Sequence, residues 1–403
     1  MELFWLEHKK LWRKKIVKIC VLLCFVYCVI FGSILSFQWF CFGSSDDYTS
    51  AFGNNFDGYT VIKDSQEYAL SFGGELTDET LQKIVSDYQQ MEADGMGEEL
   101  EKTDWQIVNS WLGTLYPELR DTSNYKTMIS YVDPDKLTGF YERRQQVLDE
   151  FLEVSGQVGA EKEFLHQIER KVEKPFRYEW VEGWSMLLGS MVADLGVVMA
   201  LFLGIVLSSL FAGEWHDNTS TLVLTTRNGW GKIALAKILT GLAFTVELFA
   251  LLAVSNVISQ LFFMGTAGWD MPIQNIKLIA VAPMNMLQAE IYEYAFVLLG
   301  AIGFARIVMF ISAAVKNNVL TLLLSLAVVY GPMMIAEYLP YEMQKALDLI
   351  PLVGSSTDIF RTNTFRIFGK LIWSPYLLIT IPVLIGILCM PFAIKSWSRR
   401  MKA

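Results

Sequence analysis

The chain has 403 residues, of which 53% are hydrophobic and only 19% are charged. Soluble globular proteins carry about 25% charged residues, and long apolar runs with almost no charge mark membrane-spanning helices. The composition and its distribution exclude a disordered chain, a disulfide scaffold, a collagen-like fibre and an ordinary soluble enzyme.

The net charge of −9 conceals two oppositely charged parts of the chain. Residues 41–185 contain 29 acidic and 13 basic residues, whereas the rest contains 13 acidic and 20 basic ones. An acidic, polar block is therefore inserted into a basic, apolar frame, which predicts a water-exposed domain on one side of a membrane. Because the basic residues form no continuous stripe, nucleic acid is not an expected partner.

Residues 1–42 combine an amphipathic segment with the first predicted transmembrane helix. The first dozen residues mix aromatic and charged side chains, which predicts either a short interfacial helix or a simple basic anchor. The apolar run 16–42 is too long for a cleavable signal peptide and ends in bulky residues. Cys20, Cys24 and Cys28 recur every four residues, so we expect reduced thiols on one helix face.

Residues 43–185 form the acidic block and are predicted to be a mainly helical extracytoplasmic domain. Thr77 and the Asp133–Pro134 pair are typical of helix starts. Segment 46–74 is rich in glycine, serine and asparagine, so we expect a loop or short strand there. Its carboxylates lack the spacing of a calcium loop and predict a solvated surface. Apolar stripes at helical spacing cover residues 81–91, 105–115, 137–152 and 164–172.

Residues 186–403 contain five more apolar runs, each longer than the roughly 20 residues that cross a bilayer. With the N-terminus inside, inner segments hold 14 lysines and arginines, and the short outer loops hold 5. The positive-inside rule then predicts an all-α membrane protein with six transmembrane helices in the cell membrane, both termini cytoplasmic. The mainly helical domain lies outside, between helices 1 and 2. The five runs cover residues 187–212, 238–264, 287–315, 319–339 and 371–394.

Three charged residues, Asp194, Glu247 and Arg306, lie inside predicted spans. A charge at the centre of a membrane helix costs about 2.5–3.5 kcal/mol on insertion scales, so such residues usually pair or line a cavity. The depths of Glu247 and Arg306 along their helices favour an ion pair between them. The alternative is that all three charged residues line a transport path. Further polar residues lie toward the outer ends of the spans: Asn256, Gln260, Glu290 and Glu293.

Catalytic and metal-binding signatures do not appear in the sequence. The three histidines fall on different sides of the predicted membrane, and neither H-E-x-x-H nor G-x-S-x-G occurs. Residues 226–233 lack the first glycine and the final serine or threonine of a P-loop. We therefore expect no enzyme activity, no metal site and no cofactor in this chain.

The predicted cytoplasmic loop 213–237 carries the most informative pattern in the chain. An acidic residue ends one span, a polar and then apolar stretch leads to an arginine turn, and a lysine opens the next span. This arrangement resembles the permease subunits of ABC-2 type transporters, as does the overall plan of the membrane frame. The matching positions are Glu214, Asn218, Thr219, Leu222, Leu224, Thr225, Arg227 and Lys237.

The resemblance implies an efflux function that depends on partners. In that family the loop contains a coupling helix that docks into a cytoplasmic ABC ATPase, which is present in two copies and binds ATP and magnesium. A second permease subunit, identical or related, would complete the transport path, and membrane lipid would surround both subunits. Export is the expected direction of transport. The alternative is a non-transporting membrane sensor whose outer domain binds a ligand. An integral-membrane enzyme is disfavoured because no nucleophile or metal set converges.

Overall fold

The computed structural model describes most of the chain. The described residues are 2–30, 66–67, 69, 73–95, 105–121, 123, 126–188, 192–220, 231–354, 360 and 362–398.

Among the described residues, five helices are long and apolar enough to cross a membrane, and they correspond to five of the six predicted spans. They are α12 (Val192–His216), α14 (Lys232–Met264), α15 (Met286–Val315), α16 (Asn318–Ile335) and α18 (Ser374–Ser398). The first predicted span begins as α2 (Lys15–Val29), and residues 31–42 lie outside the described part of the chain. The protein is thus an α-helical membrane protein.

Helix α15 lies at the centre of the bundle and packs against α12, α14, α16 and α18. Small residues permit its close approach to α18. A Cβ atom added at Gly303 would lie 2.5 Å from the carbonyl oxygen of Pro382, so only glycine fits at this crossing. Such small-residue contacts are typical of helix packing in membranes, where the backbones rather than long side chains meet.

The N-terminal part of the chain packs along one side of the bundle. Helix α1 (Glu2–Arg13) lies against α14, and α2 lies against both α14 and α12. Cys20, Cys24 and Cys28 are free and buried on one face of α2, as the four-residue spacing predicts.

A second, polar unit contains, within the described residues, four helices and three short 3-10 turns. The threonine predicted as a helix start is confirmed, because the Thr77 side chain accepts a hydrogen bond from the backbone N–H of Thr80 at 3.2 Å. The Asp133–Pro134 pair starts only a short turn, because Gly139 adopts φ 72° and the next helix begins after it. The elements are α6 (Asp78–Ala93), α8 (Trp105–Leu115), η2 (Pro117–Leu119), η3 (Met128–Ser130), η4 (Pro134–Lys136), α9 (Phe140–Val154) and α10 (Ala160–Glu169).

In the described part of the chain, two small antiparallel sheets lie in the connections between helices. Strand β1 (Gly74–Glu75) pairs with β2 (Arg177–Tyr178), and β3 (Thr364–Ile367) pairs with β4 (Lys370–Trp373). Because β4 takes up the residues before Ser374, the last span starts three residues later than predicted. Shorter elements in the connections are α11 (Glu182–Met186), η6 (Ile273–Asn275), η7 (Ala336–Tyr338) and α17 (Tyr341–Leu347).

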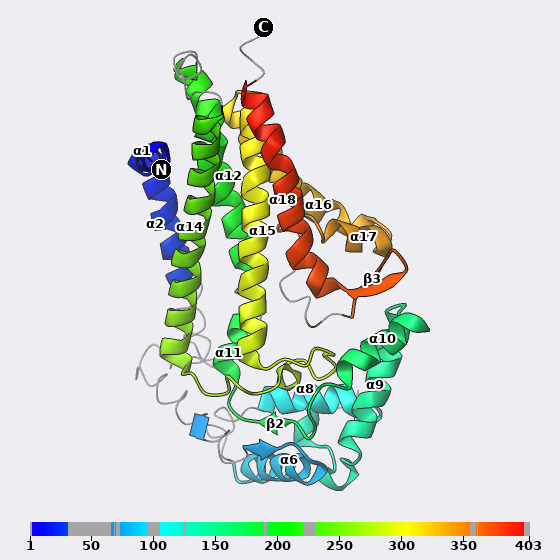
Figure 1. Ribbon diagram of the computed structural model, residues 1–403. Helices are drawn as coiled ribbons and strands as arrows, with labels where there is room; N and C mark the ends of the chain where they lie inside the picture. Colours follow the sequence, from blue (N-terminus) through cyan, green and yellow to red (C-terminus); the bar gives the residue numbers. More distant parts are fainter. Residues whose placement is uncertain are drawn as a thin grey trace.

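Figure 1 shows that the two ends of the bundle differ. Helix α1 and the C-terminal end of α18 lie at one end, whereas the polar unit lies at the other. The polar unit is held to the α14–α15 connection by Arg144, whose guanidinium donates to the carbonyl oxygens of Leu278 at 2.7 Å and Ala280 at 3.2 Å. It is therefore tied to the membrane frame by buried polar contacts.

Candidate functional site

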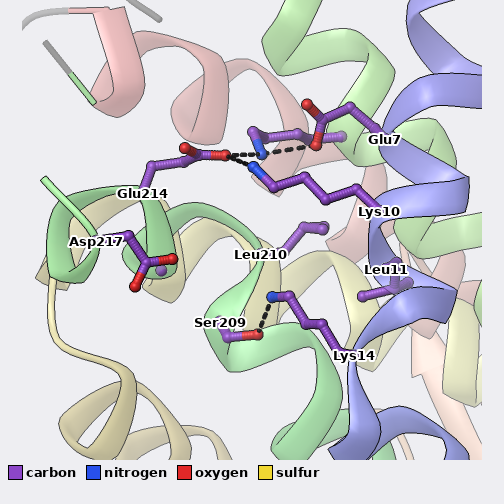
Figure 2. Close-up of a pocket in the computed structure, with 10 residues that line it drawn as sticks. Glu7, Lys10, Leu11, Lys14, Ser209, Leu210, Glu214 and Asp217 are labelled. Atoms are coloured by element: carbon purple, nitrogen blue, oxygen red, sulfur yellow. Dashed lines mark hydrogen bonds and ion pairs between the residues drawn. The ribbon is translucent and has the colours of Figure 1, made fainter. Parts of the chain in front are cut away.

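Four alternating charges join α1, α12 and α14 at the end of the bundle away from the polar unit. Glu214 Oε1 accepts hydrogen bonds from Lys10 Nζ at 2.6 Å and from Lys237 Nζ at 2.8 Å. Lys237 Nζ also contacts Glu7 Oε2 at 2.8 Å. Figure 2 shows Glu7 and Lys10 of α1 extending toward Glu214 of α12. Glu214 and Lys237 have side chains that are only 4% and 2% exposed, so their charges depend on each other for compensation.

The position of Glu214 explains why two lysines surround it. It lies in the last turn of α12, where the helix dipole disfavours a negative charge. Asn218, with φ 57°, ends the helix in a left-handed conformation, and the Thr219 hydroxyl donates a hydrogen bond to the Glu214 carboxylate. The lysines and this local cap together hold the carboxylate at the helix end.

Lys10 of α1 and Lys14, which lies between α1 and α2, experience opposite surroundings. Burial lowers the pKa of Lys10, but its hydrogen bond and charge contact with Glu214 outweigh burial and raise that pKa above the ordinary value. Burial, together with the neighbouring charges of Lys237 and Lys10, lowers the pKa of Lys14. Lys14 Nζ donates instead to a neutral group, the Ser209 hydroxyl, at 2.9 Å. Glu214 therefore pairs with Lys10 and Lys237 and not with Lys14.

The cavity between these side chains is small. Its volume is about 30 Å³, which accommodates water but no organic substrate. The described residues contain no group of three histidine, cysteine, aspartate or glutamate side chains placed to hold a metal ion. The arrangement can fix three helix ends together, and its cavity leaves no space for an organic substrate.

The structure describes part of the predicted coupling loop 213–237. Glu214 and Lys237 come from its two ends and are brought into direct contact, while Asn218 and Thr219 cap α12 next to them. The remaining positions that match the transporter pattern lie outside the described residues: Leu222, Leu224, Thr225 and Arg227.

The structure gives Glu247 different partners from the one predicted. Its carboxylate accepts a hydrogen bond from Trp12 Nε1 at 3.0 Å and lies 3.2 Å from His8 Nε2, both on α1. Arg306 instead lies against α18, where a Cβ atom added at Gly386 would meet its Cδ at 2.7 Å. No Glu247–Arg306 ion pair forms among the described residues, because the two side chains leave their helices toward different neighbours.

The structure describes the side chain of Arg306 but not that of Asp194, the other two charged residues of the predicted spans. Arg306 Nε and Nη1 are buried without a hydrogen-bond partner in the described part of the chain. The side chain of Asp194 is outside the described residues, although its backbone belongs to α12. The transport-path hypothesis for these residues therefore stays a prediction.

Sequence reasoning missed the contribution of α1 to this site. Glu7 and Lys10 are three residues apart, which places them on one face of α1, and Lys14 follows between α1 and α2. His8 and Trp12 are four residues apart. These two pairs of polar residues at helical spacing indicate that α1 contacts charged partners on α12 and α14 and does more than anchor the chain.

Comparison with known proteins adds no relative to this picture. No protein-family model, curated protein or solved structure matches the chain.

Proposed function

We propose that this chain is the permease subunit of an ABC-2 type ATP-binding cassette transporter that exports a substrate across the cell membrane. In this proposal the chain has six transmembrane helices, both termini are cytoplasmic, and the acidic unit is extracytoplasmic. The observation that carries the proposal is the ion-pair network of Glu7, Lys10, Glu214 and Lys237. It binds both ends of the predicted coupling loop 213–237 to α1.

The network would let one contact at the loop move three helices together. Glu214 lies in the last turn of α12 and Lys237 in the second turn of α14, so a displacement of the loop would be passed to both spans. Glu214 and Lys237 are nearly completely buried, and a buried ion pair resists separation because a lone buried charge is strongly unfavourable. Such a network of ion pairs would allow the coupling loop to transmit a movement of the partner ATPase to the spans.

The proposed partners follow from what the chain lacks and what it exposes. Since the sequence has no P-loop, ATP and magnesium would be bound by two cytoplasmic ABC ATPase subunits. A second permease subunit, identical or related, would complete the path. Membrane lipid would cover the exposed apolar stripe on α14, whose members are Val254, Ile258 and Phe262.

Replacing Leu222 and Leu224 together by aspartate tests the proposal. These changes put charge into the proposed apolar contact with the ATPase, where it would be buried without a partner. We expect normal membrane abundance, but loss of the ATPase from a preparation purified through this chain and loss of substrate-stimulated ATP turnover. The matched control, methionine at both positions, keeps the contact apolar and should retain the ATPase. A double aspartate variant with full ATPase content and coupled turnover would refute the proposal.

A ligand-binding membrane sensor is the second candidate, and one cavity favours it. An open cavity of about 560 Å³ lies between α9 and the connections that precede α15 and α18. It is large enough for a small molecule. Its lining residues are Phe151, Ser155, Lys277, Tyr341, Gln344, Phe360, Thr362 and Asn363. Ligand binding without any associated ATPase would favour this reading over transport.

A further inference from the structure

Helix α15 carries two buried carboxyl groups that no part of the proposed coupling uses. Glu290 is 4% exposed and Glu293 is fully buried. They are three residues apart, so they share one face of the helix, and they lie close enough to act on each other electrostatically. None of their four oxygen atoms has a partner within the usual hydrogen-bond distance and angle among the described residues, and the Tyr294 hydroxyl is the donor that acts on Glu290 from outside those limits.

Neutral polar groups surround this acid pair. Asn256 of α14 donates from Nδ2 to the Tyr294 hydroxyl at 3.0 Å, and Tyr294 lies next to Glu290. One turn further along α14, Gln260 donates to Met186 Sδ at 3.2 Å, and its Oε1 is buried without a partner. The site therefore offers acceptor oxygens in excess of donors.

Among the described residues, the elements packed around the pair bring no positive charge to it. Their ionisable side chains near this level are Cys28 on α2, Glu182 on α11, Tyr292 and Tyr294 on α15 and Tyr376 on α18. Arg306 lies 13 residues beyond Glu293, about 20 Å along the helix at 1.5 Å per residue, and faces α18. In the described part of the chain, no lysine, arginine or histidine forms an ion pair with either carboxyl group.

We propose that Glu290 and Glu293 form a proton-binding site inside the membrane frame. Two adjacent carboxylates in an apolar interior without a counter-charge do not ionise together, so the pair holds at least one proton at neutral pH. When movement of α14 against α15 admits water, a carboxylic O–H bond breaks, the proton passes to a water molecule, and a carboxylate remains. Closure reverses the step. This site goes beyond the proposed transport function and does not depend on it.

A proton fits the site better than a metal ion. A calcium ion takes six to eight oxygen ligands, and magnesium demands a nearly octahedral set. The described residues here provide two carboxyl groups and one free amide oxygen, and no group of three acidic, histidine or cysteine side chains gathers around them. The ligand class is therefore the proton.

Infrared spectroscopy of the purified full chain at neutral pH tests the proposal directly. A protonated carboxylic acid has a carbonyl stretch that a carboxylate lacks. We expect this band in the wild-type protein, a smaller band in Glu290→Gln or Glu293→Gln, and its loss in the double variant. Glu118→Gln is the control, because that exposed carboxylate pairs with Arg143 and should leave the band unchanged. Identical spectra for the wild type and the double variant would overturn the proposal, as would loss of the band on adding sodium or calcium ions at constant pH.

A measurement on the unmodified chain covers the case in which the variants fail to fold. A hydrophobic carbodiimide reacts with protonated carboxyl groups in apolar surroundings, and mass spectrometry locates the adduct. We expect labelling at Glu290 or Glu293 that declines as the pH is raised, with none at Glu118. No adduct at either residue, or labelling that is independent of pH, would contradict a proton-binding pair.

Discussion

At the scale of single residues, Arg144 and Glu169 show how a buried charge is tolerated in the polar unit. Arg144 is completely buried, yet Nη1 contacts Glu169 Oε1 at 2.6 Å while its other nitrogens donate to backbone carbonyl oxygens. Lys174 Nζ reaches the same carboxylate at 2.8 Å. Burial raises the pKa of Glu169, but the hydrogen bonds from Lys174 and Arg144 outweigh it and hold that pKa below its ordinary value of 4.5.

The Glu169 site makes a prediction about acid stability. Because its pKa is lowered in the folded protein, the ion pairs stabilise the fold above pH 4.5, and this stabilisation is lost as the pH falls through the folded-state pKa. Glu169→Gln should cost about 3–5 kcal/mol of unfolding free energy at neutral pH, since Arg144 loses a buried partner.

Thermal unfolding followed from neutral to acidic pH checks this expectation. The deficit of Glu169→Gln relative to wild type should shrink below pH 4.5. The control Glu150→Gln removes an exposed carboxylate and should keep the wild-type pH profile. A deficit that is constant over the whole pH range would show that the ion pairs do not carry this stability.

The partners of Glu247 are open to a double-mutant cycle. Because Trp12 Nε1 donates to Glu247, changing Trp12→Phe and Glu247→Gln should give a coupling energy of about 0.5–3 kcal/mol, as residues in contact do. The matched cycle of Glu247→Gln with Arg306→Gln should be additive within about 0.5 kcal/mol. Unfolding in detergent measures both cycles, and the reverse pattern would restore the Glu247–Arg306 pair.

At the scale of elements, α1 is an integral part of the bundle rather than a detached anchor. Leu11 is 2% exposed within the bundle core, whereas Leu6 on the same helix is 64% exposed. The helix also contributes Glu7 and Lys10 to the network and Trp12 to Glu247. Its apolar and charged contacts both hold it against α12 and α14.

Two leucines on α1 provide a matched test of this packing. Leu11→Ala should reduce the unfolding free energy by about 2–5 kcal/mol, because it removes buried methyl groups and leaves a cavity. Leu6→Ala should change it by no more than about 0.5 kcal/mol, as surface changes usually do. Equal effects in a detergent unfolding assay would mean that α1 is not packed as described.

At the scale of the whole molecule, the connections alternate between two ends of the bundle (Figure 1). The polar unit and the β3–β4 hairpin share one end, where Arg366 contacts Glu161 at 2.6 Å and the Thr364 hydroxyl donates to Gln157 Oε1 at 2.8 Å. The network around Glu214 occupies the other end. This separation matches a chain that presents one face to each side of a membrane.

Cysteine labelling of intact cells tests which end is outside. In a background without native cysteines, Ser123→Cys in the polar unit should react with an impermeant thiol reagent, because we assign that unit to the exterior. Asp217→Cys lies at the opposite end, is also exposed, and should react only after the cells are opened. Labelling of Asp217→Cys alone in intact cells would invert the proposed topology.

The sequence by itself determined the features that depend on local composition. Apolar runs fixed the five described spans because hydropathy and length are properties of contiguous residues. The cap at Thr77 and the buried face of Cys20, Cys24 and Cys28 followed from helical spacing for the same reason. The transporter resemblance also came from a contiguous segment, and part of it lies outside the described residues.

Only the tertiary structure decided which charges meet. Glu214 and Glu7 converge on Lys237, and Glu247 turns to α1 instead of Arg306, because packing sets the rotation of each helix about its axis. A sequence gives the depth of a residue along a span but not the neighbour it faces. For the same reason, the sequence did not predict that Glu290 and Glu293 are buried without hydrogen-bond partners of usual geometry in the described part of the chain. That property depends on which side chains the surrounding helices place next to them.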